Sequence, residues 1–204
     1  MNPFSTVVTG ASRPPLLALL AAAFALPAAA QAPLPVDLQV RLAVQAAPAD
    51  MRDGATVHGW NADGSVSVLR QGDNEMICLA PNPTREDFEV SCHHEGLEPF
   101  FERGRELAMA GVTGNARTQA RWDEYTAGTL PIPFGATNYI LTGEGFDPAT
   151  AEIQSPYLRW VIYTPEATAT STGLPEAGGA PGAPWLMFAG TPGSHIMISP
   201  PRGN

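Results

Sequence analysis

Alternating apolar and polar residues mark a series of short strands in the first half of the chain. Residues 55–60 and 65–70 (ATVHGW and SVSVLR) flank an Asn-Ala-Asp-Gly segment, which is typical of a β-hairpin. A second turn at 71–74 leads into another apolar run at 75–80 (EMICLA). Pairing the three runs in order gathers five apolar side chains on one face: Val57, Val66, Val68, Ile77 and Leu79. The pattern predicts a three-stranded meander.

The middle of the chain has the spacing of amphipathic helices instead. Over 97–110, apolar residues recur every three or four positions, and Gly111 supplies a stop. The charged residues of this segment fall on the opposite, solvent side: Glu98, Glu102, Arg105 and Glu106. A second helix is predicted over 115–127.

Strand patterns return near the C-terminus, at 138–142, 157–164, 185–189 and 195–199. Between them, residues 173–184 are rich in Gly and Pro and predict a surface loop. The sequence therefore predicts an α+β fold. We expect a mostly antiparallel β-sheet, made of the N-terminal three-stranded meander plus C-terminal strands, with two helices inserted in the middle.

The N-terminal stretch has the features of a secretory signal peptide. An uncharged apolar run at 16–26 follows Arg13 and precedes Ala28-Ala29-Ala30, which fits an A-x-A cleavage site. The run is too short for a bilayer span, which takes about 20 residues. We therefore expect a signal peptide over 1–30, an Ala/Pro-rich tether over 31–50 and a single globular α+β domain over 51–204. The expected location is periplasmic or extracellular.

Charge narrows the classes of partner. The chain has a formal net charge of −9, and all 11 of its basic residues are Arg. An acidic surface without basic clusters argues against nucleic acid and anionic membranes as partners. The sequence contains no phosphate-binding glycine loop, H-E-x-x-H or EF-hand motif, so no cofactor and no metal is predicted.

The two cysteines, Cys78 and Cys92, are predicted to form a disulfide, because an isolated pair oxidises outside the cytoplasm. In the chain-entropy model, a disulfide that closes this loop stabilises the fold by roughly 3 kcal/mol. The alternative is a pair of thiolate metal ligands, but the chain has no C-x-x-C motif.

The densest polar cluster is Cys92-His93-His94-Glu95. Three interpretations stay open. The cluster is a turn whose side chains cap the following helix, a polar ligand pocket, or part of a metal site. Neighbouring residues on a strand point to opposite faces, so a metal site would need further imidazoles, and only His58 and His195 supply them.

His195 opens the last predicted strand, directly after a Pro-Gly turn, where a scaffold can present a side chain to a cleft. Ser171 and Thr172 precede the Gly/Pro-rich loop. A hydrolase could pair Ser171 with His195, although the chain has no G-x-S-x-G elbow. The same hydroxyls could equally serve a turn by bonding to the backbone.

Four strings of the chain resemble those of a group of uncharacterised secreted bacterial proteins: GATVHGWNADGSVSVLRQGDNEMICLAPNP, CHHEGLEPFFERGREL, TPEATATSTGLP and PWLMFAGTPGSHIMI. The resemblance extends over most of residues 50–199 and implies a single exported domain. It implies no activity, so no site residue is taken from it.

Three classes of function remain, in descending order. The first is a non-catalytic domain that binds a small molecule or a peptide in a cleft lined by His93, Glu95, Ser171, Thr172 and His195. The second is a structural or stress-related envelope protein. The third is an enzyme, either a hydrolase that uses His195 with Ser171 or a metal-dependent enzyme that uses His93 and Glu95.

Overall fold

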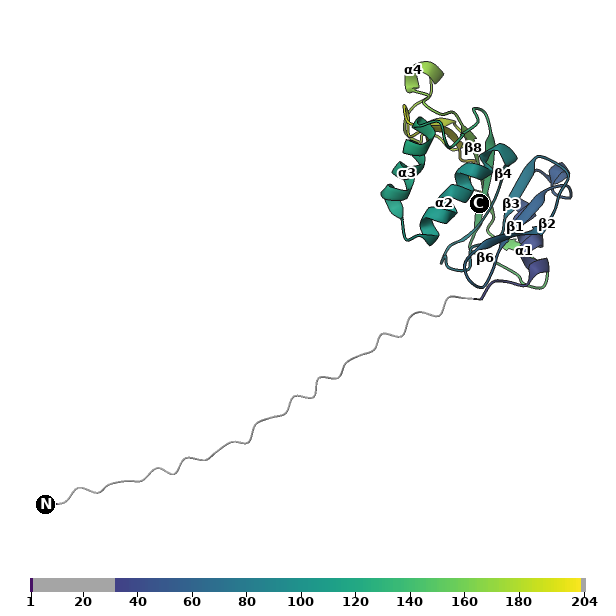
Figure 1. The fold of residues 1–204 in the computed structure, drawn as a ribbon. Coiled ribbons are helices and arrows are strands. Elements are labelled where there is room, and N and C mark those ends of the chain that lie inside the picture. Colours follow the sequence, from purple (N-terminus) through teal and green to yellow (C-terminus); the bar gives the residue numbers. More distant parts are fainter. Residues whose placement is uncertain (2–31, 203–204) are drawn as a thin grey trace.

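The protein folds around a single large mixed sheet, seen here in a computed structural model that describes Met1 and residues 32–202 (Figure 1). The strand order is β2-β1-β3-β4-β5-β8-β10-β9, and every pair of neighbours except β1 and β3 is antiparallel. The bounds of these strands are β1 Thr56–Trp60, β2 Val66–Arg70, β3 Met76–Leu79, β4 Phe88–His94, β5 Thr137–Gly143, β8 Tyr157–Tyr163, β9 Trp185–Met187 and β10 His195–Ile198. A separate two-stranded ribbon pairs β6 (Gly145–Phe146) with β7 (Ile153–Gln154).

Helices cover both faces of this sheet. The predicted α+β class is confirmed, because the strand pairs are mainly antiparallel and strands do not alternate with helices along the chain. The two helices predicted in the middle of the chain are α2 (Glu98–Met109) and α3 (Gly114–Thr126), which lie together on one face (Figure 1). Helix α1 (Val36–Ala43) packs on the other face, and α4 (Ala169–Thr172) is a single turn. Three short 3₁₀ helices complete the set: η1 (Val44–Ala46), η2 (Ala49–Met51) and η3 (Glu95–Leu97).

The hairpin of β1 and β2 is confirmed, but the predicted three-stranded meander is wrong in its third strand. Strand β3 does not pair with β2; it crosses to the far side of β1 and pairs with it in parallel. The crossing depends on Gly72, because a Cβ there would lie 2.1 Å from the carbonyl oxygen of Gly54. That carbonyl then accepts the backbone N–H groups of Asp73 and Asn74 at 2.9 and 3.1 Å. Residues 71–74 are therefore not a hairpin turn. They form a crossover connection that packs against the residues just before β1.

Residues 36–47 lie in the stretch that the sequence assigns to a tether, yet they form α1 and η1 and pack into the core. Leu42, Ala43 and Ala46 are completely buried there, against Val57 and Val90 of the sheet. The remainder of the predicted signal peptide beyond Met1 lies outside the described residues. In the part of the chain that the structure describes, no helix is long and apolar enough to cross a membrane.

The predicted disulfide is confirmed. Cys78 and Cys92 stand directly opposite each other on β3 and β4, with an S–S distance of 2.06 Å, and both are fully buried in the core on the α1 face. Because neighbouring residues on a strand face opposite sides, His93 points away from this core, toward α2.

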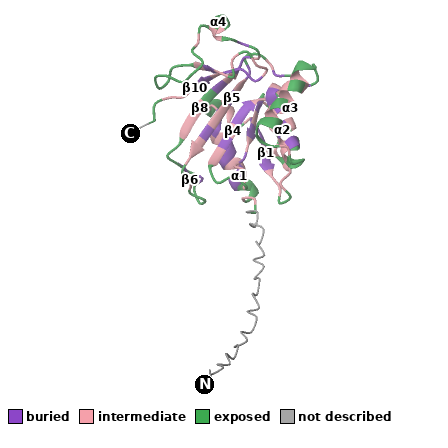
Figure 2. Ribbon diagram, turned by 90° about the vertical axis from the view of Figure 1, so that its left-hand side faces the viewer, coloured by how far each residue is buried: buried purple, intermediate pink, exposed green. Residues whose placement is uncertain are grey.

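The α2 face of the sheet is packed less completely than the α1 face. Figure 2 shows buried residues concentrated along β4 and the other central strands, whereas α3 has no buried residue at all. The apolar cluster on the α2 face includes Leu97, Phe100, Val161 and Met197. Beside this cluster, the sheet and α2 enclose open space.

Candidate functional site

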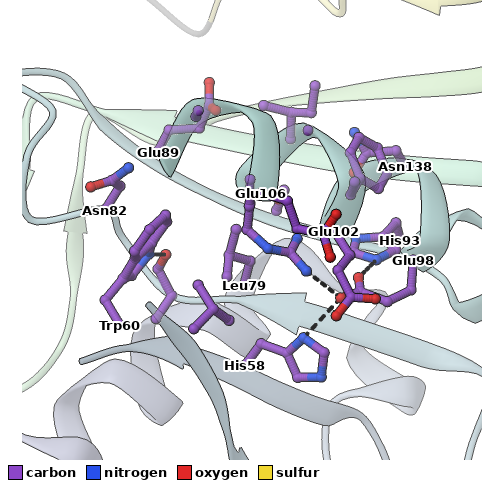
Figure 3. A pocket seen from close by; sticks show the side chains of 18 of the residues that line it. His58, Trp60, Leu79, Asn82, Glu89, His93, Glu98, Glu102, Glu106 and Asn138 are labelled. Atoms are coloured by element: carbon purple, nitrogen blue, oxygen red, sulfur yellow. Dashed lines mark hydrogen bonds and ion pairs between the residues drawn. The ribbon is translucent and has the colours of Figure 1, made fainter. Parts of the chain in front are cut away.

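A groove of about 970 Å³ runs between α2 and the sheet. Its walls are α2 on one side and the hairpin of β1 and β2 on the other, and α3 borders one end. The floor consists of alternate residues of the central strands, which include Glu89, Ser91, His93, Asn138, Ile140 and Val161. Figure 3 shows floor side chains such as His93 and Asn138 together with Glu98, Glu102 and Glu106 of α2. Most of the named floor side chains are polar, which is unusual for a sheet face that lies under a helix.

A half-buried carboxylate, that of Glu98, holds together one part of the groove. Glu98, at the start of α2, lies between His93 of β4 and His58 of β1 (Figure 3). The distance from His93 Nε2 to Glu98 Oε2 is 2.7 Å, and that from His58 Nδ1 to Glu98 Oε1 is 3.2 Å. The guanidinium of Arg105, two turns further along α2, forms an ion pair with the same carboxylate. Glu98 thus holds three donors from three separate elements.

These three donors keep the carboxylate of Glu98 ionised. Burial alone would raise the pKa of Glu98, but the hydrogen bonds from His58 and His93 and the charge of Arg105 outweigh it. They hold the pKa of that carboxyl well below its usual range. Burial lowers the pKa of His93, even though Glu98 acts in the opposite direction. His93 is therefore neutral at pH 7, and since an ionised carboxylate only accepts, its Nε2–H donates to Glu98.

Another part of the groove contains His195, at the start of β10, and Tyr163, at the end of β8. His195 Nδ1–H donates to the carbonyl of Gly193 at 2.8 Å, which leaves Nε2 with a lone pair. Burial lowers the pKa of His195, so its ring is neutral at pH 7. Burial also raises the pKa of Tyr163 to about 12, so its hydroxyl keeps its proton.

Aromatic contacts connect these two parts. The ring centroids of His93 and Phe101 are 4.6 Å apart, those of Phe101 and Tyr163 are 6.1 Å apart, and those of Tyr163 and His195 are 5.4 Å apart. His93 and His195, both singled out from the sequence, therefore line the same groove.

The other three residues predicted to line the cleft lie elsewhere. Glu95 is exposed at the start of η3 and does not border the groove. Ser171 and Thr172 belong to α4, where their hydroxyls donate to the carbonyl of Thr168, as the turn interpretation expects. His94 accepts from the backbone N–H of Gly96 at 3.1 Å and so caps η3.

This placement bears on the chemistry that the site can support. A nucleophile and its base need to lie within hydrogen-bond reach, and Ser171 does not border the groove that His195 lines. Among residues 32–202, no group of three or more His, Cys, Asp or Glu side chains is arranged to hold a metal ion. The carboxylate nearest to that description, Glu98, is instead surrounded by hydrogen-bond donors.

Sequence reasoning assigned Glu98 and Arg105 to the solvent side of their helix. Seven residues apart, they do share one face of α2, but that face lines the groove. The spacing of the two residues is visible in the sequence, but it does not distinguish a helix face that lines a groove from one that is exposed to solvent.

Comparison of the chain with protein-family models, with curated proteins and with solved structures finds no match in any of the three. The groove itself is therefore the basis for any statement about function.

Proposed function

We propose that this chain is an exported domain that binds a small organic molecule in the groove between α2 and the sheet, without catalysing a reaction. The observation that carries the proposal is a large groove whose buried polar side chains lack protein partners. Asn138 is 6% exposed, and its Oδ1 has no hydrogen-bond partner among the described residues. Arg121 and Arg159 also border the groove, and the Nε atom of each is buried without a hydrogen-bond partner among the described residues.

Unpartnered polar groups of this kind are costly in a closed core, at about 1–3 kcal/mol each, and are tolerated where water or a ligand can reach them. The groove volume of about 970 Å³ is within the range of small-molecule sites. The proposal omits a catalytic step because Ser171, the candidate nucleophile, donates to the carbonyl of Thr168 and does not border the groove that His195 lines.

Export is supported by the disulfide, because structural disulfides persist in oxidising compartments and are rare in the cytosol. N-terminal sequencing of the native protein tests this part of the proposal. We expect a mature chain that begins near Gln31; an intact Met1 in protein with two free thiols would contradict export.

Ligand binding is testable with a neutral, polarity-sensitive dye, N-phenyl-1-naphthylamine. We expect a saturable rise in its fluorescence with the wild-type protein. Ile140→Trp fills the floor of the groove and should abolish the signal, while Ile162→Trp is the matched control. Ile162 is equally half-buried but does not border the groove.

Circular dichroism and thermal melting establish that both variants are folded. Equal dye binding by two folded variants would show that the groove is not the site. No saturable binding by the wild type would overturn the proposed function and favour a structural envelope protein.

A further inference from the structure

Two arginines at the α3 end of the groove stand out because they have no counter-charge. Arg117 and Arg121 are one turn apart on α3, and both border the groove. Within the described residues, the ion pairs of arginine involve Arg41, Arg85, Arg103, Arg105 and Arg159, and neither Arg117 nor Arg121 takes part in one. The nearby carboxylate of Glu124 is already engaged by Arg103 in contacts of 2.8–3.0 Å.

The protein nevertheless holds Arg121 in a fixed place. Its guanidinium carbon lies 4.1 Å from the centroid of the Phe100 ring, and its Nη1 donates to the Phe100 carbonyl at 3.4 Å. Gly104 makes the room, because a Cβ there would lie only 3.0 Å from Nη1. The side chain is thus preorganised across α2, at the border of the groove.

This arrangement carries an electrostatic cost that no ion pair among the described residues offsets. Burial lowers the pKa of Arg121, and the neighbouring positive charge of Arg117 lowers it further. The Phe100 ring and carbonyl favour its charge, but no described carboxylate pairs with it. In addition, the Nε atoms of both arginines are buried without a hydrogen-bond partner. A bound anion would remove the repulsion and use donors that are otherwise idle.

Tyr163 supplies a further donor on the same side. Tyr163 is 8% exposed and borders the groove, and its protonated hydroxyl can donate to a ligand. Its ring centroid is 5.9 Å from that of Phe100, on which Arg121 stacks. The groove next to these donors is lined by Val161, Met187 and Met197, and methionine side chains adapt to varied apolar shapes.

We propose that Arg117, Arg121 and the Tyr163 hydroxyl form an oxyanion subsite, so that the ligand of the groove is an organic anion with a carboxylate or phosphate head and an apolar body. The subsite rests on the proposed function, because it assigns one end of the same groove. It also adds a ligand class that the groove volume alone does not give.

Two dyes that differ by one sulfonate test the subsite separately from the groove. N-phenyl-1-naphthylamine is neutral, and 8-anilino-1-naphthalenesulfonate has the same rings with an oxyanion attached. We expect the anionic dye to bind the wild type at least tenfold more tightly, and this preference should shrink as salt is added.

The variants follow from the contacts. Arg117→Met with Arg121→Met keeps side-chain bulk and removes both charges, and it should reduce the preference for the anionic dye over the neutral dye by roughly tenfold or more. Tyr163→Phe should weaken the anionic dye by a few-fold. The matched control is Arg41→Met on α1, which removes a positive charge on the other face of the sheet.

Competition then identifies the head group. Benzoate and phenyl phosphate share a ring, so the one that displaces the anionic dye at the lower concentration gives the class of oxyanion. Four results would overturn the subsite: equal affinity for the two dyes, equal loss with Arg41→Met, an unaffected double variant, or no displacement by either competitor. If neither dye binds, both the groove proposal and the subsite proposal are wrong. If only the neutral dye binds, the groove proposal is supported and the subsite proposal alone is wrong.

Discussion

Exchanging the half-buried carboxylate of Glu98 for an amide, by Glu98→Gln, should destabilise the fold by about 3 kcal/mol. Removing one partner of a buried ion pair costs about 3–5 kcal/mol, because the other charge stays buried and unpaired. The side chains of Glu98 and Arg105 are 15% and 17% exposed, so we take the lower end of that range. The amide NH₂ of glutamine would also face a donor from His58, His93 or Arg105, which gives a repulsive contact in place of a hydrogen bond.

Glu124→Gln is the matched control, since it makes the same chemical change in an ion pair between α2 and α3. Its pair with Arg103 is more exposed, with the two side chains at 30% and 36%, and such pairs contribute about 0–1 kcal/mol. The assay is urea unfolding at pH 7, with thermal melting as a second measure. For a chain of this size, 3 kcal/mol corresponds to a fall in Tm of about 6–12 °C.

The pH dependence adds a second test of the same reasoning. The pKa of Glu98 is lower in the folded protein than in the unfolded chain, where a glutamate titrates near about 4.3. Its contribution is therefore fully present above that value and is lost as the pH falls below it. Glu98→Gln should flatten the decline in stability between about pH 5 and pH 3. If Glu98→Gln and Glu124→Gln cost the same and have the same acid slope, the carboxylate does not organise the cluster.

Further predictions concern other parts of the structure. Gly72→Ala should cost about 2 kcal/mol or more, because the new Cβ meets backbone at the crossover, whereas Gly179→Ala, with open space around it, should change urea stability by less than about 0.5 kcal/mol; equal effects would refute the close approach. Replacing both Cys78 and Cys92 by Ala should lower the free energy of unfolding by roughly 3 kcal/mol, and an unchanged urea midpoint would contradict the loop-entropy argument. Burial lowers the pKa of His195, so the folded protein holds this ring neutral and is destabilised as the pH falls below about 6.5, where an unfolded histidine takes up a proton. His195→Gln should therefore make the free energy of unfolding decline less steeply between about pH 7 and pH 5. An unchanged decline would count against a buried neutral ring.

Local patterns predicted the parts of the fold that depend on neighbouring residues. The Asp-Gly turn identified the β1–β2 hairpin, the 3.6-residue period identified α2 and α3, and the two isolated cysteines identified the disulfide. These features follow from local backbone preferences or from a single possible pairing. The sequence therefore specifies them without knowledge of the complete fold.

The parallel step from β1 to β3 could not be predicted in the same way. A glycine-containing turn such as 71–74 is compatible with a hairpin and with a crossover, and the choice depends on whether Gly72 meets the backbone of Gly54. That contact joins segments that are distant in the sequence. The burial of α1 is a similar case, because its short apolar stripe is identified as part of the core only once the sheet against which it packs is known.

The candidate site was predicted in part. His93 was singled out from the Cys-His-His-Glu cluster and His195 from its place at the start of the last predicted strand, and both line the groove. Glu98, Arg117 and Arg121 were missed, because a helix face that borders a polar groove has the same periodicity as one that borders water. Only the position of the opposing sheet distinguishes the two.

The alternation of residues on β4 and β5 has a practical consequence for protein engineering. Val90 and Leu141 point into the α1 core, while their chain neighbours Ser91 and Ile140 point into the groove. A combinatorial library at groove-facing positions outside the His93–Glu98 contact and the apolar cluster on the α2 face would leave the α1 core untouched. Under the proposed function, laboratory selection at those positions would change which ligands the groove accepts.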